Sequence, residues 1–169
     1  MVAGIDIREH GSGNAGTTNV LRTIGKKAAV ATLAGDVLKG VIAVLLGRYF
    51  GGEDLAMLCG LAAIIGHIWP VIFGFRGGKG IATGIGAVLA LSPQLAGICI
   101  LIGLLIILFT KYVSLAAIIG VSVLPIAAYF YNSQYLLWGL AVAFIAIIKH
   151  RSNIKRLLAG TESKVSLKK

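Results

Sequence analysis

A stretch rich in glycine and small polar residues opens the chain and could bind an anion. It runs from His10 to Arg22 and precedes a long apolar segment, in a chain that is 57% hydrophobic. Glycines can adopt positive φ and so turn successive backbone N–H groups toward one ligand. Ser12 adds a hydroxyl group, and Arg22 adds a planar guanidinium that can donate two parallel hydrogen bonds to a phosphate. A polar loop without a ligand stays open as the alternative. The other groups predicted to bind phosphate here are those of Gly11, Gly13, Asn14, Gly16, Thr18 and Asn19.

A second cluster of glycines and cations reads Arg76-Gly77-Gly78-Lys79-Gly80. It is not a nucleotide-binding P-loop, because no glycine stands five residues before Gly78 and Gly80 replaces the serine or threonine that follows the P-loop lysine. An anion site made of backbone amides, Lys79 and the start of the following helix is supported instead. The residues predicted to hold a phosphate here are Gly77, Gly78, Lys79 and Gly80.

The third basic cluster begins at Lys149 and includes His150, Asn153 and Arg156. Their spacing of three places them on one side of a helix. His150 carries the one kind of side chain that titrates near neutral pH unperturbed, which suits a proton acceptor. The alternative is a basic helix that contacts anionic lipid headgroups.

Long apolar segments separate these clusters and predict an all-α, polytopic membrane protein. Only 13% of the residues are charged, which is typical of a membrane protein. Five or six spans with short loops use all 169 residues and leave no room for a soluble domain, so one membrane domain over residues 1–169 is expected. The first segment contains Asp36 and Lys39, which could pair on one helical face. About six transmembrane segments are predicted, the third of them short or re-entrant: Ala28–Phe50, Leu55–Phe75, Ile81–Leu91, Leu95–Thr110, Val113–Tyr131 and Tyr135–Ile148.

The loop charges give the expected orientation. If the opening loop is cytoplasmic, the turns at 51–54, 92–94 and 132–134 lie outside and contain no lysine or arginine. The other connections and the tail then lie inside, as the positive-inside rule requires. All three basic clusters would therefore share the cytoplasmic face and form a site for one or two small anions.

Several other functions are disfavoured. The net charge of +10 sits at segment ends, without a basic stripe interleaved with aromatics, so no nucleic-acid partner is expected. The three histidines are far apart and lack metal-ligand spacing, so no metal site or cofactor is expected. The His-x4-Asp pattern of one familiar class of acyltransferases does not occur. The residues five positions after the three histidines are Ala15, Ile72 and Lys155. Ser12 is not in a Gly-x-Ser-x-Gly nucleophile elbow.

The three clusters closely resemble the signature motifs of the bacterial acyl-phosphate:glycerol-3-phosphate acyltransferases, the PlsY family. The first and second motifs are matched by residues 11–22 and 77–83, and the third by residues 150–162. The resemblance implies transfer of a fatty acyl group from acyl phosphate to the 1-hydroxyl of sn-glycerol 3-phosphate, giving lysophosphatidic acid and phosphate in phospholipid biosynthesis. It also implies that Ser12, Arg22, Lys79, His150 and Asn153 are functional positions. We expect Ser12, Arg22, His150 and Asn153 to be catalytic.

The resemblance further implies a multi-pass enzyme of the bacterial plasma membrane with its site on the cytoplasmic side. A soluble acyl-phosphate synthase is a candidate partner there. The family looks like seven membrane helices, the first before the Gly-Ser-Gly-Asn loop, so we expect that helix to be absent from this chain. Two other classes stay open: a transporter of a phosphorylated metabolite, which would also have broken helices and glycine-lined anion sites, and a structural subunit that binds anionic lipid.

Overall fold

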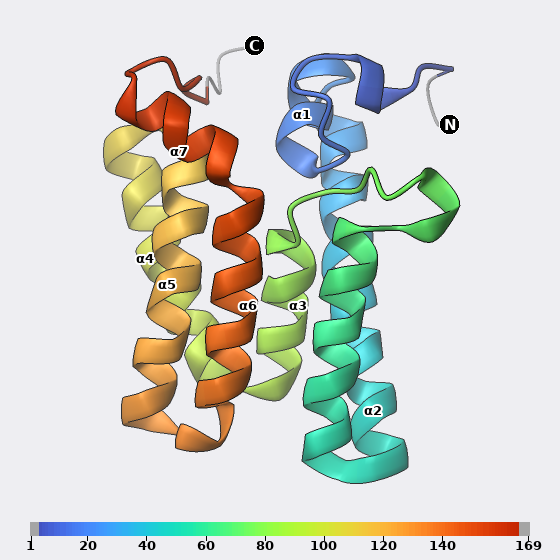
Figure 1. Cartoon of the computed structure of the whole chain (residues 1–169), viewed down its shortest axis with the longest axis vertical. Helices are drawn as coiled ribbons and strands as arrows, with labels where there is room; N and C mark the ends of the chain where they lie inside the picture. Colours follow the sequence, from blue (N-terminus) through green and yellow to red (C-terminus); the bar gives the residue numbers. More distant parts are fainter. Residues whose placement is uncertain (1–3, 166–169) are drawn as a thin grey trace. The chain divides into compact units, whose positions relative to one another are not determined.

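The computed structural model describes residues 4–165, which form helices joined by short loops (Figure 1). The chain divides into two compact units, the first ending at Leu91 and the second beginning at Ser92. In the first unit the helices are η1 (Ile7–Glu9), α1 (Thr17–Thr23), α2 (Lys26–Ile68), η2 (Val71–Phe73) and α3 (Ile81–Leu91). In the second unit they are α4 (Pro93–Thr110), α5 (Val113–Tyr131), η3 (Ser133–Tyr135), α6 (Leu136–Lys149) and α7 (Arg151–Leu158).

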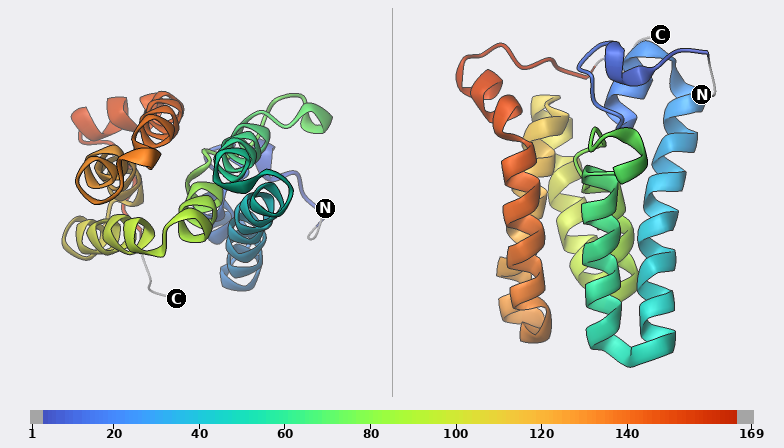
Figure 2. Two further views of the ribbon diagram at one scale, coloured as in Figure 1. Left: turned by 90° about the horizontal axis from the view of Figure 1, so that it is seen from below. Right: turned by 45° about the vertical axis from the view of Figure 1, so that its right-hand side comes forward.

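The long helix α2 is a hairpin of two arms. Its backbone leaves the helical region at Gly51 and at Gly52, where φ is +70°. The two arms then run side by side in opposite directions (Figure 2). Because the arms are antiparallel, the loops before Lys26 and after Ile68 lie at the same end of this unit.

Close backbone contacts hold α3 against α2. A Cβ at Gly40 would collide with the carbonyl oxygen of Thr83, and a Cβ at Gly86 would collide with that of Val37. Small residues at helix contacts let backbones approach in this way in membrane proteins, where dispersion and not hydrophobicity drives helix association. Arg48 closes the other end of the unit by donating to the carbonyl of Ala90, at 2.8 Å.

The second unit packs α4, α5 and α6 together, with α7 turned away from α6. Gly139 of α6 lies against Pro125 of α5, where a Cβ would approach the proline Cα to 3.3 Å. The axes of the segments on either side of His150 differ by 61°. The C-terminal residues return to the start of α5, since the N–H of Val165 donates to the carbonyl of Lys111.

Helix length and composition support a membrane protein. Three helices are long and apolar enough to cross a bilayer, or four if the bent pair of α6 and α7 is one span. That count takes the α2 hairpin as one helix. Large apolar side chains are exposed along the helices, as lipid-facing surfaces require; they include Val30, Leu38, Leu45, Leu101 and Leu108.

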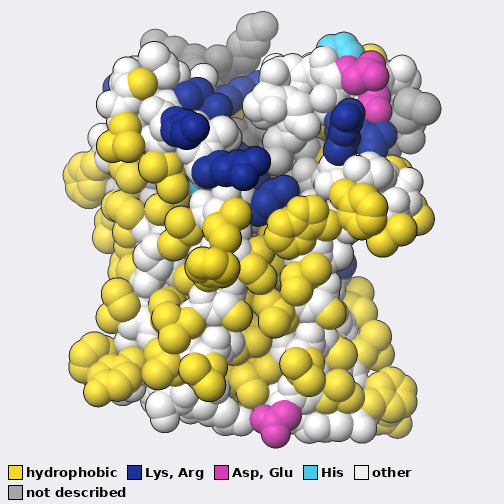
Figure 3. Space-filling view, viewed as in Figure 1, with side chains coloured by type: hydrophobic (Ala, Val, Ile, Leu, Met, Phe, Trp, Pro, Cys, Tyr) yellow, Lys and Arg dark blue, Asp and Glu magenta, His cyan; other side chains and the backbone are white. Residues whose placement is uncertain are grey.

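The all-helical fold is confirmed, and a helix occupies each of the six predicted segments. Some boundaries were wrong. The turn predicted at residues 92–94 is a break at Ser92 only, since α4 begins at Pro93. The second segment was predicted to continue to Phe75, but the helix ends at Ile68 and a 3-10 turn follows. The turn predicted at residues 51–54 is a break at Gly51 and Gly52 only, with Glu53 already helical. On the face drawn in Figure 3, Lys and Arg side chains gather near one end of each unit, hydrophobic side chains predominate along the helices, and an acidic side chain lies at the opposite end.

Candidate functional site

The first glycine loop is organised by the side chain of Asn19, which is 3% exposed. Its Oδ1 accepts a hydrogen bond from the N–H of Ser12 at 2.9 Å. Its Nδ2 donates to the carbonyls of Ile7, His10 and Asn14 at 2.9 to 3.2 Å. One amide therefore ties together four backbone groups of η1 and the loop. The structure gives Asn19 this organising position, and its predicted contact with phosphate stays a prediction.

Glycine is required at two positions of this loop. Gly11 has φ +63° and Gly13 has φ +69°. At Gly11 a Cβ would also collide with Oδ1 of Asn19. Gly16 was also predicted to adopt a positive φ, but its φ is −87° and it is the N-cap of α1. Its N–H donates to Oδ1 of Asn14, so that side chain too serves the loop itself.

Other predicted residues lie on the outside of this loop. Ser12 and Arg22 are exposed, and Arg22 stands on the last turn of α1 with Thr18 on the first. Ser12 has no titratable side chain bonded to it among the described residues. The structure therefore gives Ser12 no adjacent general base within residues 4–165.

The second glycine loop lies across the end of α2. The N–H of Gly78 donates to the carbonyl of His67 at 3.1 Å, and Gly80 has φ +84°. A Cβ at Gly77 would collide with the same carbonyl, and a Cβ at Gly78 with Nε2 of the His67 ring. The glycines are thus needed because the loop approaches His67 too closely for any side chain. Lys79 follows Gly78 in this loop, and α3 begins at Ile81, directly after Gly80.

Beneath this loop, charged residues meet from both arms of α2. The Lys39 ammonium donates to Oδ1 of Asp36 at 2.6 Å, which confirms the predicted pair. It also lies 2.6 Å from Nδ1 of His67, which the sequence placed only at a segment end. Nδ1 is 3.3 Å from Oδ1 of Asp36.

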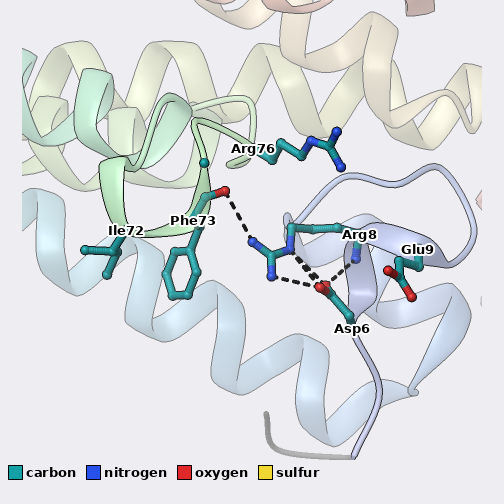
Figure 4. Close-up of a pocket in the computed structure, with 7 residues that line it drawn as sticks. Asp6, Arg8, Glu9, Ile72, Phe73 and Arg76 are labelled. Carbon is teal, nitrogen blue, oxygen red and sulfur yellow. Dashed lines mark hydrogen bonds and ion pairs between the residues drawn. The ribbon is translucent and has the colours of Figure 1, made fainter.

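A surface pocket lies beside the first loop and η2 (Figure 4). Arg8 pairs with Asp6 at 2.8 Å, and the side-chain and backbone hydrogen bonds from Arg8 lower the pKa of Asp6 to about 2. The guanidinium of Arg8 also donates to the carbonyl of Phe73 at 3.4 Å and lies 5.2 Å from the centre of its ring. The positive charge of Arg8 in this pocket is balanced by the Asp6 carboxylate. None of the predicted site residues lines the pocket.

In the second unit, Glu162 connects the basic tail to α5. Its Oε1 accepts from Ser114 at 2.8 Å and from Asn153 at 2.7 Å, and its Oε2 accepts from Arg156 at 2.6 Å. Burial raises the pKa of Glu162, but these hydrogen bonds and the Arg156 charge outweigh it, so the pKa is lowered overall. The carboxylate is therefore ionised at neutral pH and fixes the Asn153 amide.

His150 lies at the junction of α6 and α7 and is 3% exposed. Its Nδ1 is 2.7 Å from the carbonyl of Ala146. Because a carbonyl only accepts, Nδ1 carries a proton and donates it to Ala146. The predicted common side is confirmed for Asn153 and Arg156, since both bond Glu162, whereas His150 precedes α7 as its N-cap.

The sequence analysis assigned no role to three residues that make central contacts in the structure: His67, Ser114 and Glu162. Glu162 was part of the third motif, but nothing in the sequence indicated that its partner was Ser114, 48 residues earlier. No group of three or more His, Cys, Asp or Glu side chains within residues 4–165 could hold a metal ion.

The comparisons with known proteins agree with one another. The family model for glycerol-3-phosphate acyltransferase matches residues 1–160. A protein of that name from Thermoanaerobacter sp. (strain X514) is 57% identical over 166 residues, which are 97% of this chain and 84% of the relative.

Two crystal structures of PlsY, described as an integral membrane glycerol 3-phosphate acyltransferase, have the same fold. The glycerol 3-phosphate form matches with a TM-score of 0.92 at 40% identity, over 98% of this chain and 84% of that one. The lysophosphatidic acid form matches with a TM-score of 0.86 at 40% identity, over 92% and 81%. The chain therefore belongs to the glycerol-3-phosphate acyltransferase family of integral membrane proteins.

Proposed function

We propose that this protein transfers a fatty acyl group from acyl phosphate to the 1-hydroxyl of sn-glycerol 3-phosphate. The products are lysophosphatidic acid and inorganic phosphate. Family membership supports an acyltransferase, and the related crystal structures were described with glycerol 3-phosphate and with lysophosphatidic acid. The observation that carries the proposal is the pair of glycine loops at one end of the first unit, which suits a reaction between two phosphorylated substrates.

In this proposal each glycine loop of the first unit holds one phosphate group. Lys79 and the amides of the Gly77–Gly80 loop, apart from that of Gly78, which donates to the His67 carbonyl, hold the phosphate of glycerol 3-phosphate, because a point cation beside backbone N–H groups suits a compact dianion. Arg22 and the first-loop amides that do not donate within the loop hold the acyl-phosphate group and offset the charge that develops on its carbonyl oxygen. Holding both substrates converts a bimolecular encounter into a reaction between fixed neighbours.

The acyl transfer itself needs no covalent enzyme intermediate. The glycerol 1-oxygen attacks the acyl carbon, the bond from that carbon to the phosphate oxygen breaks, and inorganic phosphate leaves. Acyl phosphate is already activated, and Ser12 has no general base beside it among the described residues, so Ser12 positions the substrate by hydrogen bonding. Trapping of an acyl group on Ser12 after acid quench, or on the cysteine of Ser12→Cys, would contradict this role.

His150 accepts the proton of the attacking hydroxyl group at Nε2. The hydrogen bond from its Nδ1 to Ala146 supports this role, because a ring whose Nδ1 donates can accept a proton only at Nε2. Asn153, fixed by Glu162, orients substrate beside it. A pH profile of activity unchanged in His150→Ala would remove His150 from this role.

The enzyme works on the cytoplasmic side of a bacterial plasma membrane, where the basic loops of both units face inward. A soluble acyl-phosphate synthase would deliver the donor from that side. Within residues 4–165 the cations lie in loops or near the ends of helices or of the α2 arms, except for Lys39 within α2, and this distribution favours an enzyme over a transporter.

The test uses purified protein in sealed lipid vesicles with labelled glycerol 3-phosphate. With acyl phosphate present, the label is expected in lysophosphatidic acid that extracts into organic solvent. Label that enters the vesicle lumen without forming an ester would identify a transporter. Binding without either result would leave only an anion-binding or lipid-binding subunit.

A further inference from the structure

The cluster of Asp36, Lys39 and His67 lies where the two arms of α2 meet, with the Lys39 side chain 41% exposed, and the proposed mechanism does not use it. Asp36 and Lys39 come from the first arm of α2, and His67 comes from the end of the second arm. Charged groups within membrane helices are costly and face the protein interior where they serve a function. His67 lies against Gly77 and Gly78 of the second glycine loop, so a role in binding at that loop is the function to consider.

The contacts of Lys39 fix the protonation of His67. An ammonium group has N–H donors and no acceptor, so its 2.6 Å contact with Nδ1 requires Nδ1 to accept. The ring is then neutral and its proton is on Nε2. Asp36 balances the Lys39 charge, at 2.6 Å from Nζ.

The Nε2 edge of His67 faces the second glycine loop. Nε2 lies where the Cβ of any other residue at Gly78 would be. The His67 side chain is 8% exposed, and within residues 4–165 no acceptor is bonded to Nε2. An N–H donor left without an acceptor in a mostly buried ring is costly, so its direction toward the second glycine loop indicates that a ligand bound there supplies the acceptor.

We propose that His67, held by Lys39 and Asp36, donates its Nε2–H to the phosphate group bound on the Gly77–Gly80 loop. The inference rests on the proposed function for the identity of that ligand, the phosphate monoester of glycerol 3-phosphate. His67 is then a specificity-determining binding residue: it recognises the phosphate and takes no part in acyl transfer. Asp36 and Lys39 are positioning residues, because they act through the His67 ring.

The first experiment compares two amide substitutions of similar size. The amide nitrogen of His67→Gln reaches the position of Nε2 and can donate, whereas that of His67→Asn reaches only the position of Nδ1. Binding of glycerol 3-phosphate to purified protein in nanodiscs, without donor, is measured by calorimetry. We expect the Kd to rise about tenfold or more in His67→Asn and to stay within about threefold in His67→Gln. KM for glycerol 3-phosphate should follow Kd, with kcat within about threefold of wild type. Equal affinities in both variants, whether equal to wild type or equally weakened, would overturn the proposal.

A second experiment tests the contact with Gly78. Gly78→Ala should weaken glycerol 3-phosphate binding in the wild-type background, but cause no further loss in His67→Ala, where the ring is gone. Gly77→Ala is the matched control, because its Cβ meets the His67 main-chain carbonyl and should weaken binding in both backgrounds. Equal losses from Gly78→Ala in both backgrounds would contradict the geometry.

The two proposals fail separately. Wild-type protein that binds glycerol 3-phosphate through His67 but forms no ester would refute the proposed reaction alone. Ester formation with unchanged binding in His67→Asn would refute the His67 donor alone. The unfolding temperature of each variant, measured in detergent, identifies any variant that is misfolded, and the Gln and Asn pair then decides the outcome without His67→Ala.

Discussion

Asn19 is the residue on which the conformation of the first loop depends. Both ends of its amide are used, the oxygen as an acceptor and the nitrogen as a donor to three carbonyls. Nothing in its sequence position distinguishes it from Asn14, which lies in the same polar stretch. Its role depends on how the loop closes, so it could be recognised only in three dimensions.

Asn19→Asp should therefore damage the loop although it keeps the size of the side chain. A carboxylate oxygen would face the three carbonyls that Nδ2 now serves, leaving a buried charge without donors. We expect a loss of at least about 2 kcal/mol in unfolding free energy, together with a large loss of activity. Asn132→Asp is the matched control, since the Asn132 oxygen only accepts from the N–H of Gln134 and a carboxylate can do the same. Thermal unfolding in detergent measures both, and equal unfolding temperatures would contradict the organising role of Asn19.

At the scale of elements, the packing of α3 on α2 decides where the second glycine loop lies. Gly40 and Gly86 let the two backbones touch, and α3 begins directly after the loop. The close approach of the two helix backbones needs a glycine on each helix, Gly40 on α2 and Gly86 on α3.

Gly40→Ala should push α3 away, since its Cβ collides with the Thr83 carbonyl. We expect a destabilisation of about 1–3 kcal/mol and weaker binding of glycerol 3-phosphate. Gly35→Ala lies on the same helix with open space around its Cβ, and should be neutral or stabilise by up to about 1 kcal/mol. Unfolding midpoints of the two variants compare them directly. If Gly35→Ala were the more damaging change, the packing described here would be wrong.

Glu162 ties α7 to the start of α5, and its contribution should depend on pH. Its folded pKa is lowered below the ordinary value of 4.5. The ionised group therefore stabilises the fold at pH values above 4.5, and this contribution is lost as pH falls through the lowered folded value.

Wild-type protein should be more stable than Glu162→Gln at pH 7, and the difference should shrink as the pH falls below 4.5. Unfolding temperatures measured across this range test the expectation. Glu9→Gln, an exposed change on η1, is the control and should leave the profile unaltered. A constant difference between wild type and Glu162→Gln at all pH values would argue against ionisation as the cause.

The helices could be predicted because apolar runs bounded by glycine, proline or charged residues give their positions within a few residues. The Asp36–Lys39 pair followed from its spacing of three. Contacts between distant segments could not be predicted in the same way. His67 reaches Asp36 only because α2 folds back at Gly51 and Gly52. Ser114 reaches Glu162 only because the tail returns to α5.

For the whole molecule, the central expectation is that the basic ends of both units face the same side of the membrane. The contacts of each unit place its own basic loops at one end: η1 with η2 in the first, through Arg8 and the Phe73 carbonyl, and Lys111 with the tail in the second. The arrangement of charges then predicts a single cytoplasmic face.

Single cysteines test this orientation in a background of Cys59→Ser and Cys99→Ser. Lys27→Cys and Lys155→Cys should react with a membrane-impermeant thiol reagent only from the cytoplasmic side. Asp54→Cys and Asn132→Cys are the controls and should react only from outside. Labelling of positions 27 and 155 from opposite sides would separate the two halves of the proposed site.

The proposed reaction is tested most directly by its stoichiometry. Purified protein is given palmitoyl phosphate and sn-glycerol 3-phosphate, and the ester and inorganic phosphate are measured together, with palmitoyl-CoA as the alternative donor. We predict one inorganic phosphate released for each lysophosphatidic acid formed, and no ester from the thioester. Ester formed from palmitoyl-CoA but not from palmitoyl phosphate, or phosphate released without ester, would contradict the account.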